Sequence, residues 1–207
     1  MKLRNIAVAA LALAAFAAGA EPVMVSLVTP VQFPSRDCDI AGFGLSFIYG
    51  ESRNFTGLKI GVVQRAAGAF DGVGVGGVNI AGGRIRGGQV GLVNWNCHED
   101  AAWENRSSGA QIGLVNYAGA FCGLQYGLLN VNKGPFTGCQ DGMVNCTDDV
   151  TGFQIAYVNV ASGRVRGGQL GLLNFADTME CGLQVGIVNI IAHNGWLPVL
   201  PLVNGHF

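Results

Sequence analysis

The feature that most constrains this chain is an eight-residue phrase, Gly-x-Gln-apolar-Gly-apolar-Val-Asn, that returns about every fifteen residues. Successive copies are fourteen or fifteen residues apart, except for one step of twenty-two between Gly87 and Gly109. Self-similarity at a short fixed period is the signature of a repeat architecture, so the repeat decides the fold. Clear copies begin at Gly57, Gly72, Gly87, Gly109, Gly123, Gly138, Gly152, Gly167 and Gly182, and weaker ones at Gly42 and Leu197.

Each copy has the pattern of a β-strand. Positions two, four and six are mostly apolar, as in Leu183, Val185 and Ile187, whereas positions three and five are usually Gln and Gly. Alternation of this kind, bounded by turn residues, predicts a strand. A helix is disfavoured because glycine recurs every four or five residues, at about 1 kcal/mol each relative to alanine. We therefore expect each repeat to be a strand, a turn and a short return segment.

Two all-β architectures place one such unit every fifteen residues: a β-solenoid and an up-and-down β-barrel with one repeat per strand. Three apolar rows cover roughly 14 Å along a strand, which is short of the band of about 25 Å that a lipid-facing barrel needs. We therefore predict an all-β fold, a β-solenoid of about eleven coils of 14–15 residues, with the barrel as the alternative.

In the predicted solenoid the apolar rows face inward. The opposite face, with Gln, Gly and Val or Leu in register, becomes an outer strip that either docks a partner or a second copy, or is a structural ladder covered by the return segments. Identical amides stack about 4.8 Å apart and form hydrogen-bonded ladders. The expected ladder residues are Asn94, Asn116, Asn130, Asn145, Asn159, Asn174, Asn189, Gln111, Gln125 and Gln169.

The beginning of the chain has the organisation of a secretory signal peptide. Lys2 and Arg4 precede an apolar stretch at 6–17, and small residues come before Glu21. This pattern predicts a leader at residues 1–20, removed on export.

We expect residues 21–207 to be a single β-repeat domain. Residues 21–41 would cap its N-terminal end, residues 42–189 would hold the repeats, and residues 190–207 would be a degenerate repeat and a C-terminal cap. Pro198 and other prolines near the end cannot donate ladder hydrogen bonds, which suits a closing segment.

Composition excludes several functional classes. The formal net charge is −1 and 12% of residues are charged, so the chain has no basic stripe for nucleic acid. No segment after the leader has the length and continuity of a membrane helix, so insertion into a membrane would require a β-barrel. The histidines lie in no nucleophile or metalloprotease motif, and the glycine phrases precede no helix that could bind a dinucleotide. We expect no enzymatic activity, no cofactor and no bound metal.

The insertion at residues 95–108 interrupts the array and is the expected binding loop, because insertions in repeat proteins lie on one face that often carries function. Trp95 and Trp103 are candidate contacts for a ligand or partner, with His98 beside them. The six cysteines form an even set in a chain predicted to be exported, so disulfides are plausible. Cys122 and Cys139, only two positions out of column on neighbouring coils, are the expected pair.

Tandem Gly-x-Gln phrases after a leader, as at 109–116 and 182–189, resemble the surface-repeat proteins of spirochaetes and other Gram-negative bacteria. The resemblance covers residues 42–204 and implies export and display at or just inside the outer surface. It implies a structural or adhesive element of the cell envelope with an envelope or host partner. A small outer-membrane β-barrel protein is the alternative function. The expected compartment is the cell surface, the outer membrane or the periplasm.

Overall fold

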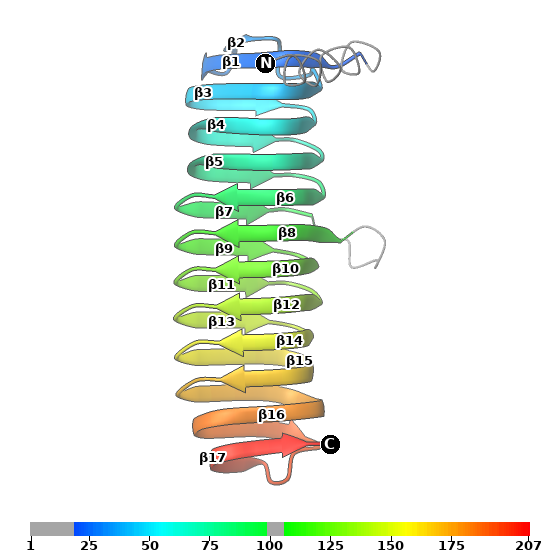
Figure 1. Ribbon diagram of the computed structural model, residues 1–207, viewed down its shortest axis with the longest axis vertical. Helices are drawn as coiled ribbons and strands as arrows, with labels where there is room; N and C mark the ends of the chain where they lie inside the picture. Colours follow the sequence, from blue (N-terminus) through cyan, green and yellow to red (C-terminus); the bar gives the residue numbers. More distant parts are fainter. Residues whose placement is uncertain (1–18, 99–105) are drawn as a thin grey trace, which may run out of the picture. The chain divides into compact units, whose positions relative to one another are not determined.

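The computed structural model describes residues 19–98 and 106–207, which form two compact units that divide after Cys97. The described chain is all-β, and its stacked parallel coils make a β-solenoid of about eleven turns (Figure 1). This confirms the predicted fold and excludes the barrel alternative, in which neighbouring strands would run antiparallel. The predicted leader at 1–20 lies outside the described residues except for its last two. No helix in the described part of the chain has the length and apolar character needed to cross a bilayer.

The first unit stacks its repeats position for position. Gly42 pairs with Gly57, Gly57 with Gly72, and Gly72 with Gly87, all between parallel strands. The strands are β1 (Glu21–Val28), β2 (Val31–Phe33), β3 (Ile40–Ser52), β4 (Phe55–Ala66), β5 (Phe70–Ala81), β6 (Ile85–Val90) and β7 (Val93–Asn96).

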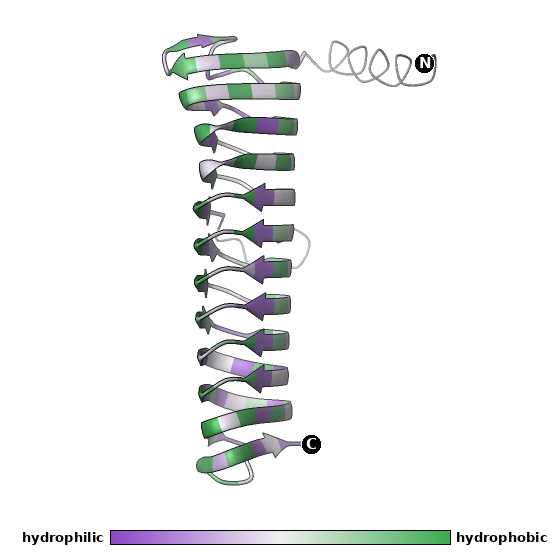
Figure 2. Cartoon of the chain, turned by 60° about the vertical axis from the view of Figure 1, so that its left-hand side comes forward, coloured by the Kyte–Doolittle hydropathy of each residue, from purple (hydrophilic) through white to green (hydrophobic). Residues whose placement is uncertain are grey.

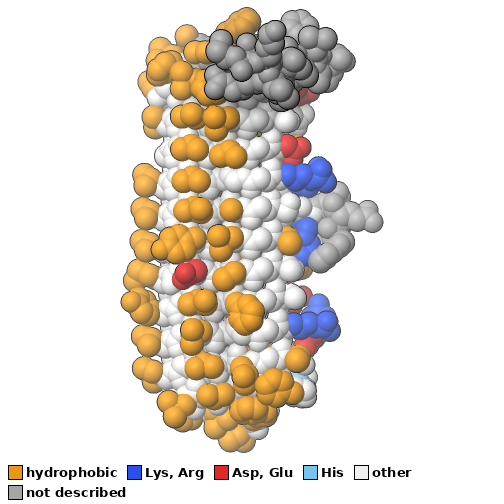
Figure 3. Space-filling model, in the orientation of Figure 1, with side chains coloured by type: hydrophobic (Ala, Val, Ile, Leu, Met, Phe, Trp, Pro, Cys, Tyr) orange, Lys and Arg blue, Asp and Glu red, His pale blue; other side chains and the backbone are white. Residues whose placement is uncertain are grey.

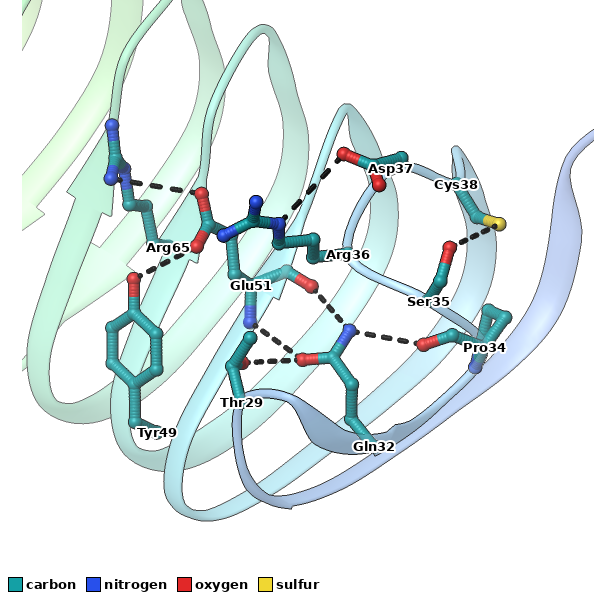
Figure 4. A network of polar contacts seen from close by, with 10 residues as sticks. All are labelled: Thr29, Gln32, Pro34, Ser35, Arg36, Asp37, Cys38, Tyr49, Glu51 and Arg65. Atoms are coloured by element: carbon teal, nitrogen blue, oxygen red, sulfur yellow. Dashed lines mark hydrogen bonds and ion pairs between the residues drawn. The ribbon is translucent and has the colours of Figure 1, made fainter.

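The strands β1 and β2 lie at the N-terminal end of the first unit, where β1 pairs with β3 in parallel and with β2 antiparallel. The Gln32 amide ties β2 to the first coil, as Figure 4 shows. Its Nε2 donates to the Glu51 carbonyl at 2.8 Å and to the Pro34 carbonyl at 3.0 Å, and its Oε1 accepts from the Thr29 hydroxyl at 2.6 Å. A side-chain amide therefore satisfies backbone groups at this edge of the sheet, as the inward amides do inside the coils.

The second unit repeats the same arrangement and ends with an antiparallel strand, β17, beside β16. Its strands are β8 (Ser107–Ile112), β9 (Val115–Ala118), β10 (Phe121–Tyr126), β11 (Leu129–Asn132), β12 (Phe136–Asp141), β13 (Val144–Thr147), β14 (Val150–Ile155), β15 (Val158–Leu170), β16 (Leu173–His193) and β17 (Val199–His206).

Each coil is flattened and contributes one segment to each of two parallel sheets. In the second unit β10 pairs with β8 and β12, while β11, from the same coil, pairs with β9 and β13. The side chains between the two segments form the interior. Because the register is maintained from coil to coil, residues of similar hydropathy recur at the same place in successive strands (Figure 2).

The prediction that positions two, four and six face the interior is wrong, since the structure places the two faces the other way round. The position-three glutamines are buried, with Gln125 fully so, and the position-eight asparagines are buried as well. Leu124, Tyr126 and Leu128, at positions two, four and six of the same coil, are 39%, 55% and 50% exposed. The predicted outer strip of glutamines is therefore an interior row, and the apolar rows form the outer surface.

The interior has an apolar part and a polar part. One inward row, two residues before the first glycine, is buried and, apart from Ser107, apolar from Phe55 to Val165. The rings of Phe121 and Phe136 stack in this row with centroids 6.4 Å apart. Small inward residues such as Ala118 and Ala176 lie against this row. The glutamine and asparagine rows fill the rest of the coil's cross-section.

The first glycine of each repeat has a conformation that other residues rarely adopt. Gly123 has φ of 139°, and a Cβ built on it would lie 2.0 Å from the Gly109 carbonyl oxygen. The backbone of one coil thus approaches the next too closely for any side chain. This close approach explains why glycine returns at the first position of every clear copy.

Candidate functional site: an apolar outer face

The outward rows at repeat positions two, four and six make up an apolar face, and we use that name for them below. In the first unit the face includes Leu58, Ile60 and Val62 of one coil, each more than a third exposed. In the second unit it includes Phe153, Ile155 and Tyr157 of one coil. Side chains of this size are usually withdrawn from water, so their alignment in rows along a surface marks a candidate binding site.

In the second unit the apolar face has a shallow, open groove of about 670 Å³, which we call the glycine groove. The position-five residues Gly142, Ala156, Gly171 and Gly186 form its floor because they lack bulk. Position-four residues form one wall and position-six residues the other. The walls are Ile155, Leu170 and Val185 on one side and Tyr157, Leu172 and Ile187 on the other, with Leu202 and Val203 at one end.

The groove continues toward the start of the second unit. A smaller section of about 290 Å³ shares Gly142 and Tyr157 with the glycine groove and extends to Gly113. It spans two further rungs, and it brings in one acidic residue, Asp141. The hollow thus follows the axis of the stack, with the same repeat positions forming its floor and walls at each rung.

Charged side chains gather away from the apolar face, at the edge that Figure 3 shows opposite the rows of apolar side chains. In the second unit Arg164 Nη2 lies 2.9 Å from the Asp149 carboxylate, and Glu180 accepts from Arg164 and Arg166. Burial by itself would raise the pKa of Asp149, but hydrogen bonds from the Arg164 side chain and backbone outweigh it and lower the pKa. The Arg166 hydrogen bond lowers the pKa of Glu180. Each coil is therefore amphipathic across its width.

Two ladders explain why the interior tolerates so many amides. Asn116 Nδ2 donates to Asn130 Oδ1 at 2.8 Å, and the same contact recurs through Asn189 at 2.8–3.0 Å. Gln125 Nε2 donates to Gln111 Oε1 at 2.8 Å, and this contact recurs through Gln184 at 2.6–2.8 Å. The asparagine amides donate toward the C-terminal end and the glutamine amides toward the N-terminal end, so their dipoles oppose. Because each amide finds a partner, burying it carries little of the usual penalty.

The glutamine row is interrupted in the first unit, and this interruption was not predicted from the sequence. Position three is Lys59 in one coil and Gly74 in the next. Lys59 is 1% exposed, and its Nζ donates to the Arg65 carbonyl at 2.8 Å and to the Ser52 hydroxyl at 3.3 Å. Burial lowers the pKa of Lys59 to about 7, with Glu51 opposing the shift. The departure from glutamine at position three was the available sequence signal.

A small cavity of about 10 Å³ lies beside Lys59, where a side chain at Gly74 would point toward Phe70 and Asn79 of the cavity lining. Gln64 and Asn79 line it, and Gln64 Oε1 and Asn79 Oδ1 have no hydrogen-bond partner in the described part of the chain. A cavity of this size holds about one water molecule, which needs polar partners of this kind.

The predicted binding loop is only partly described. Trp95 lies in β7 beside Ile80 and is 40% exposed, and His98 is partly buried. Trp103 lies outside the described residues, so the structure does not place it relative to Trp95. The candidate site described above uses neither tryptophan. The apolar face was not predicted as a site because the alternation in the sequence was interpreted with its apolar rows inside.

The predicted bond between Cys122 and Cys139 is absent, and all six cysteines are free thiols. In the parallel register Cys122 pairs with Thr137, and Cys139 pairs with Leu124. A displacement of one coil and two residues separates two Cα atoms by roughly 8 Å, which exceeds the limit of about 7 Å for a disulfide. The two-residue offset therefore prevents the bond.

Comparisons with protein-family models, with curated proteins and with solved structures find no match to this chain.

Proposed function

We propose that this protein is an exported, non-enzymatic structural element of a bacterial cell envelope that holds a partner on its apolar face. The observation that carries the proposal is the outward position of the apolar rows, above all the walls of the glycine groove. Export and the envelope rest on the leader-like residues 1–20 and on the resemblance of the repeats to bacterial surface-repeat proteins.

The extent of the apolar face favours a binding role. The eight large apolar side chains that line the groove are each between 39% and 73% exposed and lie next to one another. Large contiguous patches of this kind are uncommon, since the largest apolar patch on a typical monomer is about 300–600 Å². Burial of apolar surface is favourable by about 25 cal/mol per Å² removed from water, so covering this face with a partner would release substantial free energy. A chain exported to water would therefore be expected to bring this surface against another apolar surface.

The chemistry of the groove supports binding rather than catalysis. Its lining is glycine, alanine, aliphatic residues and Tyr157, so it offers shape and apolar contact. General acid–base or nucleophilic catalysis needs titratable groups placed around a reacting atom. The only such group on this lining is the phenol of Tyr157.

Fractionation of cells that express the full chain tests the proposal. We expect the protein outside the inner membrane, in the envelope fraction, resistant to high salt and released by mild detergent. Changing both Leu172 and Ile187 to Glu should leave export intact and release the protein without detergent. Retention of the wild-type chain in the cytoplasm, or equal retention of the variant in the envelope, would refute the proposed function.

A further inference from the structure

We infer that the glycine groove of the second unit binds the same groove of a second copy of this chain. The inference rests on the proposed function and names the partner of that same face. We infer a second copy because an identical groove matches this one in three properties: the period of its side chains, its shape and its size.

The first property is the period. The walls place one apolar side chain at each rung, and the rungs of a parallel stack are about 4.8 Å apart. A second copy has the same spacing, so when one side chain of its wall fits between two rungs, all the others fit as well. A partner with a different period would meet the wall in register only occasionally.

The second property is the shape, because the groove and its wall are adjacent and complementary. The position-six wall, with Tyr157, Leu172 and Ile187 at 58%, 51% and 63% exposed, projects beside the floor of small residues. A two-fold axis places the wall of each copy over the floor of the other. Such an interface uses one patch twice, which gives a closed dimer rather than an open filament. Apolar side chains then interdigitate between facing sheets, as in dry sheet-to-sheet packing.

The third property is the size and charge of the contact. The eight large apolar side chains that line the groove are each between 39% and 73% exposed, so together with their neighbours they offer an apolar area of the same order as the roughly 800 Å² that each partner contributes to a standard stable interface. Among the described residues that line the glycine groove, none is charged. Asp141 lines the smaller continuation of the groove, so a contact centred on Leu170 and Leu172 keeps this carboxylate at the wet rim.

A lipid surface fits the groove less well. The three apolar rows are together only roughly 14 Å wide. The regular spacing of their side chains gives no advantage in binding a fluid surface, because such a surface has no fixed period. The described lining also carries no lysine or arginine that would attract anionic headgroups. We therefore treat lipid binding as a competing outcome of the test.

Sedimentation equilibrium of the purified protein, from micromolar to millimolar concentration, tests the inference. We expect a monomer–dimer equilibrium without higher species. Leu172→Glu should raise the dimer dissociation constant at least 100-fold, because each two-fold contact buries two new charges. Ala156→Phe, which fills the groove floor without adding charge, should raise it as well. Thr151→Glu is the control, because it adds the same charge at an exposed position of the second unit that is outside the apolar face and does not line the groove.

Thermal unfolding followed by circular dichroism shows that each variant is folded before its mass is interpreted. A monomeric wild-type protein across the whole range, or a dimer unaffected by both groove variants, would overturn the inference. Flotation with vesicles of neutral and of anionic lipid is measured on the same samples. A monomer that binds vesicles through Leu172 overturns the second copy as partner and leaves the proposed function standing. A monomer that binds neither vesicles nor the cell envelope overturns both.

Discussion

Asn130 Nδ2 lies 2.8 Å from Asn145 Oδ1, so the inward amide of one coil donates a hydrogen bond to the inward amide of the next. The second proton of Asn130 goes to the Asp141 carbonyl at 3.0 Å. One side chain thus joins neighbouring coils and satisfies a backbone group. The contact is local, but it recurs along the stack, and it makes a polar interior stable.

Removal of one rung should therefore be costly. In Asn145→Leu the side-chain volume is roughly kept, while one proton of the Asn130 amide loses its acceptor and Asn159 Oδ1 loses its donor. The Ile155 carbonyl loses one of its two donors and keeps the Gly142 N–H. Each buried group left unsatisfied costs about 1–3 kcal/mol, so we expect a loss of about 2–5 kcal/mol in the free energy of unfolding. Urea denaturation measures the loss. The exposed outward residue Thr151 provides the control, because Thr151→Val should change stability by less than about 0.5 kcal/mol.

Two neighbouring glycines should respond in opposite ways to the same substitution. Gly87 has φ of 127°, and a Cβ there would lie 2.0 Å from the Gly72 carbonyl oxygen. At Gly88 a Cβ would meet nothing within 4 Å. We expect Gly87→Ala to destabilise the first unit by about 3 kcal/mol or more, and Gly88→Ala to be neutral or slightly stabilising. Equal thermal midpoints for the two variants would contradict the close coil-to-coil approach.

Part of this arrangement can be predicted from the sequence, and part cannot. The period and the glycine at the first position predict stacked coils in register, and alternation predicts that Gln125 and Tyr126 face opposite ways. Alternation alone does not say which face is inside. The general preference for apolar interiors pointed the wrong way, because stacked amides satisfy one another and fill a narrow coil at little cost.

The repeats nevertheless contain a signal for the correct orientation. In the copies from Gly87 to Gly182, Gln and Asn do not change at positions three and eight, whereas position four ranges from Ile112 through Tyr126 to Asp141. A row that accepts an aromatic residue and a carboxylate faces solvent. The glycine groove could not be predicted before the faces were assigned, because its floor and walls depend on which rows point outward.

Lys59 should make stability depend on pH. Burial lowers its pKa from 10.5 to about 7 in the folded protein. Between these values the unfolded chain binds more protons than the folded chain, so the free energy of unfolding rises with pH. Below about pH 7 the folded protein must hold a buried charge, and the penalty, on the order of 4 kcal/mol, is fully present.

Lys59→Gln restores the usual residue at position three and removes this titration. We expect the variant to be more stable than the wild type at pH 6, with the difference shrinking as the pH rises toward 10. Urea midpoints at several pH values measure the difference. Lys133→Gln is the matched control, because Lys133 is exposed and its replacement should leave the pH profile unchanged. A constant offset between Lys59→Gln and the wild type at every pH would contradict a neutral, buried lysine.

The charged edge should contribute little to stability despite its short contacts. Arg164 bridges Asp149 and Glu180, but its own side chain is 64% exposed. Exposed ion pairs are typically worth 0–1 kcal/mol and weaken with salt. We expect Arg164→Ala to lower the free energy of unfolding by less than about 1 kcal/mol. Phe136→Ala in the buried apolar row should cost about 3–5 kcal/mol in the same assay.

Hydrogen exchange of the side-chain amides, followed by NMR, tests most directly whether glutamine and asparagine fill the interior while leucine and tyrosine face outward. We expect the side-chain NH₂ protons of Gln125, Gln140, Asn130 and Asn145 to exchange orders of magnitude more slowly than those of the exposed Asn194. Exchange of the ladder amides as fast as that of Asn194, in a folded protein, would contradict this arrangement.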